Sequence, residues 1–254
     1  MHRLIWSRPC HFDSTTAPAC FTLAQMPRGA FITFEGSEGC GKSTQVLRLA
    51  ARLEQAGTPI LITREPGGTP IGEKIRDLRQ FAPESFAMTA EAELLLFEAS
   101  RSQLVREIIE PALARGTVVI SDRFSDSTTV YQGVARKLSA EIVETLNAFA
   151  IGPARPDITF ILDVDVETAR ARLLRRVRPV AVNDRMEQEP VEFYERVCQG
   201  YRALAAREPD RFILIDGRQS SDAIESEIWE ALTKRLPAFP SLSRSKVENR
   251  KAKI

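Results

Sequence analysis

The apolar residues of this chain follow two alternating patterns: short uninterrupted runs, and longer stretches with helical periodicity. Uninterrupted runs bounded by turn residues are typical of strands buried on both faces. Apolar residues that recur every three or four positions are typical of amphipathic helices. The runs occupy residues 31–34, 60–62, 118–120, 158–162 and 212–215. The helical patterns include residues 92–109, 139–150, 166–176 and 191–207, a stretch from Val46 to Leu53 that Gly57 ends, and a last one with Ile224, Ile228 and Leu232.

Buried strands that alternate with helices predict an α/β fold with a parallel sheet covered by helices on both faces. Right-handed crossovers bring the loops that follow the strands to one edge of such a sheet, where ligands bind. No internal repeat or linker divides residues 29–236. We therefore expect one domain over this range, with an extension at 1–28 and a basic tail at 237–254.

The composition changes this picture little. Of 254 residues, 43% are apolar and 27% are charged, and the formal net charge of +1 argues against duplex nucleic acid as a partner. No run approaches the length that spans a bilayer, so we expect no membrane association. The four cysteines form no C-x-x-C pair, which favours reduced thiols and a cytoplasmic location. A transit peptide is the weaker interpretation of the Arg- and Ser-containing start.

The first strand leads into a phosphate-binding loop that fits G-x-x-x-x-G-K-[ST]. Its residues are Gly36, Ser37, Glu38, Gly39, Cys40, Gly41, Lys42, Ser43 and Thr44. Glycines let the backbone N–H groups point at phosphate oxygens, and the following helix adds its positive N-terminal end. Lys42 is expected to reach the β- and γ-phosphates of ATP, and the Ser43 hydroxyl to bind Mg²⁺. The loop alone does not name a reaction, because GTPases, motor ATPases and small-molecule kinases share it.

Three further segments carry candidate chemistry for a second substrate. Arg64 opens a Pro-Gly-Gly turn after the second strand and is either a phosphate clamp or an exposed turn residue. Asp122 and Arg123 end the third strand, where the acid is suited to metal-bound water and the arginine to phosphate. A surface ion pair is the alternative. Phe97 and Arg101 lie four residues apart on a helix, either as a base-binding pair or as core.

Taken together, these segments resemble the bacterial thymidylate kinases over residues 29–236. The most specific matches are F-E-G-S-E-G-C-G-K-S-T, T-R-E-P-G-G-T, E-A-S-R-S-Q-L-V, D-R-F-S-D-S-T-T-V-Y-Q-G and R-P-D-I-T-F-I-L-D-V, in that order. The resemblance implies a five-stranded parallel sheet, a homodimer packed through helices, and transfer of the γ-phosphoryl of ATP to dTMP with Mg²⁺, giving dTDP for dTTP synthesis.

The resemblance also implies roles for individual residues. Phe97 would stack on thymine while Arg101 donates to its O4. Arg123, joined by Arg64, would bind the acceptor phosphate, and Asp122 and Glu38 would lie near the metal, with Glu38 also near the acceptor. The positions expected to line the thymine and deoxyribose are Ser127, Thr128, Tyr131 and Gln132.

An arginine-rich segment at about residues 172–185 predicts a mobile lid. A guanidinium that arrives on closure stabilises the charge of the transferred phosphoryl group. None of the variable positions of the phosphate loop is an arginine, so the resemblance places the catalytic arginine in the lid, with Arg172 and Arg176 as the best matches. An exposed basic helix end is the alternative for these side chains.

Several alternatives stay open on the sequence alone. Another nucleotide or nucleoside kinase, or a regulatory P-loop ATPase, would carry the same loop. Cys40 is either an inert filler of the loop or a reactive thiol that solvent reaches when nucleotide is absent. The resemblance begins just after Met26, so we expect residues 1–28 to be disordered or not translated.

Overall fold

The computed structural model describes residues 28–80, 82, 87–175 and 189–236. Five strands form one sheet in the order β2-β3-β1-β4-β5, and every neighbouring pair is parallel. The predicted α/β class and five-stranded parallel sheet are confirmed. The strands are β1 (Phe31–Glu35), β2 (Ile60–Arg64), β3 (Val118–Asp122), β4 (Ile158–Asp163) and β5 (Phe212–Asp216).

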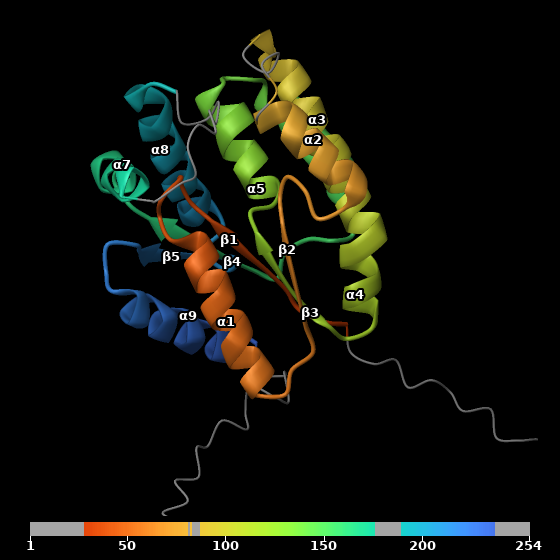
Figure 1. Ribbon diagram of the computed structural model, residues 1–254, viewed down its shortest axis with the longest axis vertical. Helices are drawn as coiled ribbons and strands as arrows, with labels where there is room; N and C mark the ends of the chain where they lie inside the picture. Colours follow the sequence, from red (N-terminus) through yellow and green to blue (C-terminus); the bar gives the residue numbers. More distant parts are fainter. Residues whose placement is uncertain (1–27, 81, 83–86, 176–188, 237–254) are drawn as a thin grey trace, which may run out of the picture.

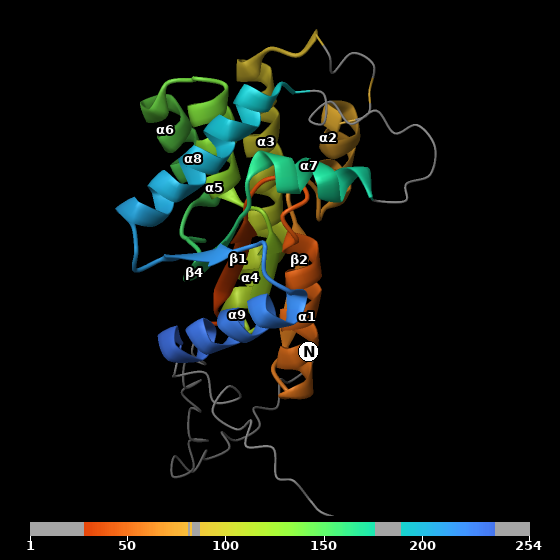
Figure 2. The same ribbon diagram turned by 90° about the vertical axis from the view of Figure 1, so that its left-hand side faces the viewer.

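Helices cover both faces of the sheet (Figures 1 and 2). On one face, α1 (Lys42–Gln55) and α9 (Ser221–Arg235) pack their apolar sides on alternate strand residues such as Ile32, Phe34 and Phe160. The intervening residues, among them Phe31, Val119 and Ile161, face the second layer. This layer contains α3 (Ala90–Leu104), η2 (Val105–Ile109), α4 (Glu110–Ala114), η3 (Thr129–Ala135) and α8 (Val191–Arg207). Burial on both faces explains why the central strands β1, β3 and β4 are continuous apolar runs, whereas the edge strands β2 and β5 are partly exposed.

The predicted helix boundaries differ from the structure at several places. The stretch 92–109 begins earlier, where the Thr89 side chain accepts a hydrogen bond from the Ala92 N–H, and it passes through a π-helical turn into α4. Helices α6 (Ala140–Ile151) and α7 (Val166–Leu174) match their predicted positions closely. Helices α2 (Pro70–Gln80) and α5 (Ser125–Thr128) were not predicted. Both are poor in buried apolar residues, so periodicity gave no signal there.

Among the described residues, no helix combines the length and the apolar character needed to cross a membrane. The extension 1–27, the tail 237–254 and most of the predicted lid lie outside the described residues. The proposed catalytic residue Arg176 is among these.

Candidate active site

The phosphate loop joins β1 to α1 at the carboxyl edge of the sheet, as predicted. Its three glycines have positive φ angles of 133° at Gly36, 77° at Gly39 and 106° at Gly41, a region that favours glycine. A Cβ on Gly36 would lie 2.6 Å from the Leu162 carbonyl oxygen. The loop therefore needs glycine for its backbone shape and for its close approach to β4.

Lys42 closes the loop from inside. Its ammonium donates to the carbonyl oxygens of Gly36 at 3.0 Å and Ser37 at 2.7 Å, and the residue is only 7% exposed. Helix α1 starts here, and its N-cap residue Gly41 makes no side-chain capping hydrogen bond. The first N–H groups of α1 are thus directed into the loop without a capping side chain, which suits phosphate oxygens.

Ser43 and Asp122 meet across the carboxyl edge of the sheet. The Ser43 hydroxyl donates to Oδ2 of Asp122 at 2.5 Å, although the two residues are 79 positions apart in the chain. Mg²⁺ in phosphate-transfer sites takes one or two protein oxygens and completes its octahedron with phosphates and water. A hydroxyl beside a carboxylate, next to a phosphate loop, therefore fits Mg²⁺.

Arg123 extends from the end of β3 over the phosphate loop. Its Nη1 donates to the Gly36 carbonyl at 3.1 Å, and its Nη2 donates to Glu38 Oε1 at 2.8 Å. The Tyr131 hydroxyl donates to Glu38 Oε2 at 2.6 Å. Burial alone would raise the pKa of Glu38, but Arg123, Lys42 and Tyr131 together outweigh it and lower this pKa. Glu38 is therefore ionised at neutral pH, beside the arginine expected to hold a phosphate.

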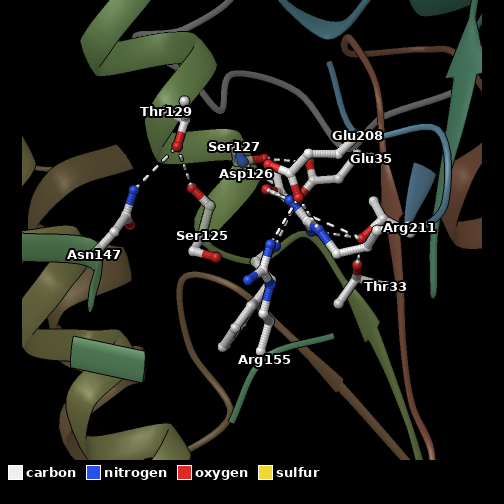
Figure 3. A network of polar contacts seen from close by, with 12 residues as sticks. Thr33, Glu35, Ser125, Asp126, Ser127, Thr129, Asn147, Arg155, Glu208 and Arg211 are labelled. Atoms are coloured by element: carbon white, nitrogen blue, oxygen red, sulfur yellow. Dashed lines mark hydrogen bonds and ion pairs between the residues drawn. The ribbon is translucent and has the colours of Figure 1, made fainter. Parts of the chain in front are cut away.

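Two residues that the sequence analysis missed support this cluster. The buried Glu35 carboxylate accepts hydrogen bonds from Ser127 Oγ at 2.6 Å and from the Tyr201 hydroxyl at 2.8 Å (Figure 3 shows Glu35 beside Ser127). A carboxylate at the end of a buried strand, directly before the loop, was a usable signal for Glu35. Tyr201 gave none, since an aromatic residue on an amphipathic helix is ordinarily core.

Arg101 is buried, with 1% exposure, and every N–H of its guanidinium has an acceptor. Nε donates to Glu65 Oε2 at 2.8 Å. Nη1 donates to Glu98 Oε1 at 2.7 Å and to Asn147 Oδ1 at 3.0 Å. Nη2 donates to Thr128 Oγ1 at 2.9 Å and to the Phe124 carbonyl at 3.3 Å. The ring of Phe97 lies under a different arginine, Arg79, whose guanidinium carbon is 4.6 Å from the ring centre. The expected pair of Phe97 and Arg101 thus shares a helix, and each member has its own partners.

The remaining predicted residues lie around this centre. Arg64 is exposed, and its Nη2 donates to both carboxylate oxygens of Glu73, at 3.0 and 2.9 Å. Gln132 is buried and donates to Glu93 at 2.6 Å. Arg172 approaches the loop from α7, with Nη1 3.4 Å from the Cys40 carbonyl oxygen. Gly39, Gly41, Thr44 and Arg172 line a pocket of about 300 Å³ together with Gln45, Gly217, Gln219 and Ser221.

Of the two alternatives for Cys40, the structure favours the inert filler over a thiol that solvent reaches. Cys40 has 0% exposure and belongs to the core cluster beneath α1 and α9. Its sulfur lies against Gly36, where an added Cβ would come within 2.8 Å of it. The inert-filler interpretation of Cys40 is the one that fits.

The fold and this site define a P-loop kinase that acts on a small phosphorylated acceptor. The thymidylate kinase family model matches residues 34–228. The chain is 46% identical to the thymidylate kinase of Geobacter sulfurreducens over 211 residues, which is 82% of this chain and 99% of that protein. It is 48% identical to that of Pseudomonas putida strain GB-1 over 200 residues, covering 79% and 93% of the two chains. The chain belongs to the thymidylate kinase family.

A solved structure agrees with this assignment. The crystal structure of thymidylate kinase from Ehrlichia chaffeensis superposes with a TM-score of 0.65 at 33% identity. The match covers 82% of this chain and 99% of that one. The resemblance noted on five sequence motifs is thereby confirmed for the family and for the fold.

Proposed function

We propose that the cleft above the carboxyl edge transfers the γ-phosphoryl group of ATP directly to the phosphate of dTMP. One observation carries this proposal. Arg123, the arginine expected to bind the acceptor phosphate, lies against the loop expected to bind the ATP phosphates, with its Nη1 3.1 Å from the Gly36 carbonyl. Two phosphates held by neighbouring cationic groups can align for in-line attack, and positioning provides most of the catalysis in phosphoryl transfer.

The donor phosphates bind in the loop of residues 36–43. Lys42, now bonded to two loop carbonyls, turns to the β- and γ-phosphates, and the N–H groups of α1 complete the cradle. The pocket that Thr44 and Arg172 line is adjacent to this loop and accommodates the nucleoside of ATP.

Ser43, Asp122 and Glu38 would hold Mg²⁺, partly through water. When bound, the ion neutralises charge on the β- and γ-phosphate oxygens. The Ser43 hydroxyl donates to Asp122, so the two oxygens already lie side by side. Both could bind the ion without a large movement.

The acceptor nucleotide lies on the other side of Arg123. Arg123 and Arg64 bind its phosphate, Tyr131 faces its sugar, Ser127 lines the thymine, and Phe97 stacks on the base. Arg101 Nη2, whose longest contact is 3.3 Å to the Phe124 carbonyl, exchanges that contact for thymine O4. Thr128 and Gln132, both buried, complete the base side. Cytosine presents an amino donor at the same position, so this contact favours thymine.

The lid at about 172–185 supplies the arginine that stabilises the transferred group. Arg172 already points to the phosphate loop from α7, with its 3.4 Å contact to the Cys40 carbonyl. Arg176 is proposed beside it from the sequence alone.

A homodimer forms through α2, α3 and α6, which pack side by side. These helices expose Ile71, Leu78, Leu95, Ile142 and Phe149, the last with 77% exposure. Burying such side chains against a second copy removes apolar surface from water. Sedimentation equilibrium of wild type should give a dimer, and Phe149→Asp should shift it towards monomer. The enzyme is proposed to work in the cytoplasm.

A coupled assay for ADP tests the reaction. ATP and Mg²⁺ with dTMP should give rapid ADP formation, whereas dCMP or no acceptor should give little. Equal ADP formation with and without dTMP would indicate an acceptor-independent ATPase and would contradict the proposal.

A further inference from the structure

Arg123 has an unusual main-chain conformation. Its φ of 73° lies in the left-handed region, which residues other than glycine rarely adopt. The Arg123 N–H donates to the Phe34 carbonyl at 3.0 Å, and Ser121 Oγ donates to the Arg123 carbonyl at 2.7 Å. Strained residues of this kind persist where the surroundings fix them, and they concentrate at functional sites.

Glu35 fixes the segment that follows Arg123. Its Oε1 accepts from the N–H groups of Phe124 at 2.8 Å and Ser127 at 3.3 Å, and its Oε2 accepts from the Ser127 and Tyr201 hydroxyls. Four donors therefore converge on one carboxylate at the end of β1, directly before the phosphate loop. In Figure 3, Asp126 of the same segment faces Arg211, which binds it through Nη1 at 2.7 Å and Nη2 at 2.9 Å.

Tyr201 brings α8 to this arrangement. Its hydroxyl donates to Glu35 at 2.8 Å and lies 3.0 Å from Ser127 Oγ, and it accepts from Arg123 Nη1 at 3.4 Å. With 1% exposure, Tyr201 is packed beneath the guanidinium, and its ring meets that of Tyr131 edge-on at 6.4 Å. Its hydroxyl already contacts Glu35, Ser127 and Arg123, so we assign it no direct contact with the acceptor nucleotide.

We infer that Tyr201 is a positioning residue that acts through Arg123. Its hydroxyl links the Glu35 carboxylate to Arg123 Nη1, directly and through Ser127 Oγ, which accepts from Nη1 at 3.0 Å. Together with the Gly36 carbonyl, these contacts fix the direction in which the guanidinium presents its outer N–H groups. The inference rests on the proposed role of Arg123 in holding the acceptor phosphate. It assigns to α8 a direct part in acceptor binding, separate from its packing on the sheet.

The test is a double-mutant cycle of Tyr201→Phe with Arg123→Ala. Tyr201→Phe should raise the KM for dTMP by about tenfold, the size of one hydrogen bond to a charged group, while the KM for ATP changes by less than about twofold. In the Arg123→Ala background, Tyr201→Phe should change the KM and the calorimetric Kd for dTMP by less than about twofold. KM does not depend on the fraction of folded enzyme, so a loss of stability does not imitate this result.

Val197→Ala is the matched control, because Val197 lies one helical turn before Tyr201 on α8 and is fully buried. It loosens the same helix without removing a hydroxyl, and it should leave the KM for dTMP near that of wild type. Equal effects of Tyr201→Phe in both backgrounds, or a Val197→Ala variant that reproduces them, would overturn the inference for Tyr201 alone. An Arg123→Ala variant with a wild-type KM for dTMP would instead overturn the role proposed for Arg123, and that of Tyr201 with it.

Discussion

The donor and acceptor sides of the active site differ in how far apart their parts lie in the chain. The phosphate loop is continuous, residues 36–44, and its geometry depends on three glycines and the start of one helix. The acceptor side assembles around Arg101, whose partners Glu65 and Asn147 are 36 and 46 positions away. Because the backbone shapes the phosphate loop, loss of one side chain there should change the stability of the fold little. Loss of one charge from a buried ionic network should lower stability strongly.

Arg101→Met is the change with the largest expected effect on stability. It removes the cation between Glu65 and Glu98, both nearly fully buried, and leaves two carboxylates without their charge partner. Breaking a buried ion pair typically costs about 3–5 kcal/mol in the free energy of unfolding. Urea unfolding followed by circular dichroism would measure this loss.

Arg48→Met is the control for that experiment, because Arg48 pairs with the exposed Asp222 at 2.6 Å. Solvent screens an exposed pair, so this variant should unfold almost as wild type does. Similar losses in the two variants would show that the buried Arg101 network contributes no more to stability than an exposed ion pair.

Lys42→Ala should have the opposite profile. Removing a preorganised cation from a phosphoryl-transfer site typically lowers kcat by about 100-fold or more, with a smaller change in the KM for ATP. The free energy of unfolding should change by about 1 kcal/mol, because the lysine bonds to neutral groups of its own loop, the carbonyls of Gly36 and Ser37 and the Cys40 sulfur. Steady-state kinetics and unfolding of the same preparation would check both parts. A variant with more than about a tenth of wild-type kcat would contradict the assignment of the loop.

The pH dependence of stability is a second test of the buried network around Arg101. Burial outweighs the attraction of Arg101 and raises the pKa of Glu65 from 4.5 to about 7, with Glu98 and Glu35 adding to the rise. Because the folded-state pKa lies above the unfolded one, the folded protein binds this proton more tightly. The free energy of unfolding should therefore fall as pH rises from about 4.5 to about 7, by up to about 3 kcal/mol.

Glu65→Gln should remove the part of that decline that comes from Glu65, since the amide oxygen still accepts from Arg101 but carries no titrating proton. A smaller decline from Glu35, whose pKa burial and Asp126 also raise, should remain. Glu73→Gln, at the exposed partner of Arg64, leaves Glu65 in place and should retain the decline. Unfolding measured at several pH values between 4.5 and 7.5 would show it. A flat profile in wild type would mean that Glu65 stays ionised throughout this range.

The same contrast explains how much the sequence revealed. The five strands and the phosphate loop were predictable because each depends on neighbouring residues, and a buried strand or a glycine turn has a local signature. The sheet order with β1 between β3 and β4 has no such signature. The partners of Arg101 and the approach of Tyr201 to Arg123 depend on contacts between distant segments. In the helical pattern of the sequence, Tyr201 and Phe97 both look like apolar residues of a buried helix face. The pattern does not reveal which residues they contact.

The smallest expected effect concerns Cys40, in the donor loop. Its side chain is fully buried, so an alkylating reagent should inactivate wild type and Cys40→Ala at the same slow rate. The second described cysteine, Cys198, should add little, because burial, together with Asp163, raises the pKa of its thiol to about 11. Cys198→Ala is the matched control, and activity against time with iodoacetamide is the measurement. Rapid inactivation of wild type that Mg-ATP prevents and Cys40→Ala escapes would show that the loop opens without nucleotide. The donor side would then be a mobile site, and its contrast with the fixed acceptor network would be greater.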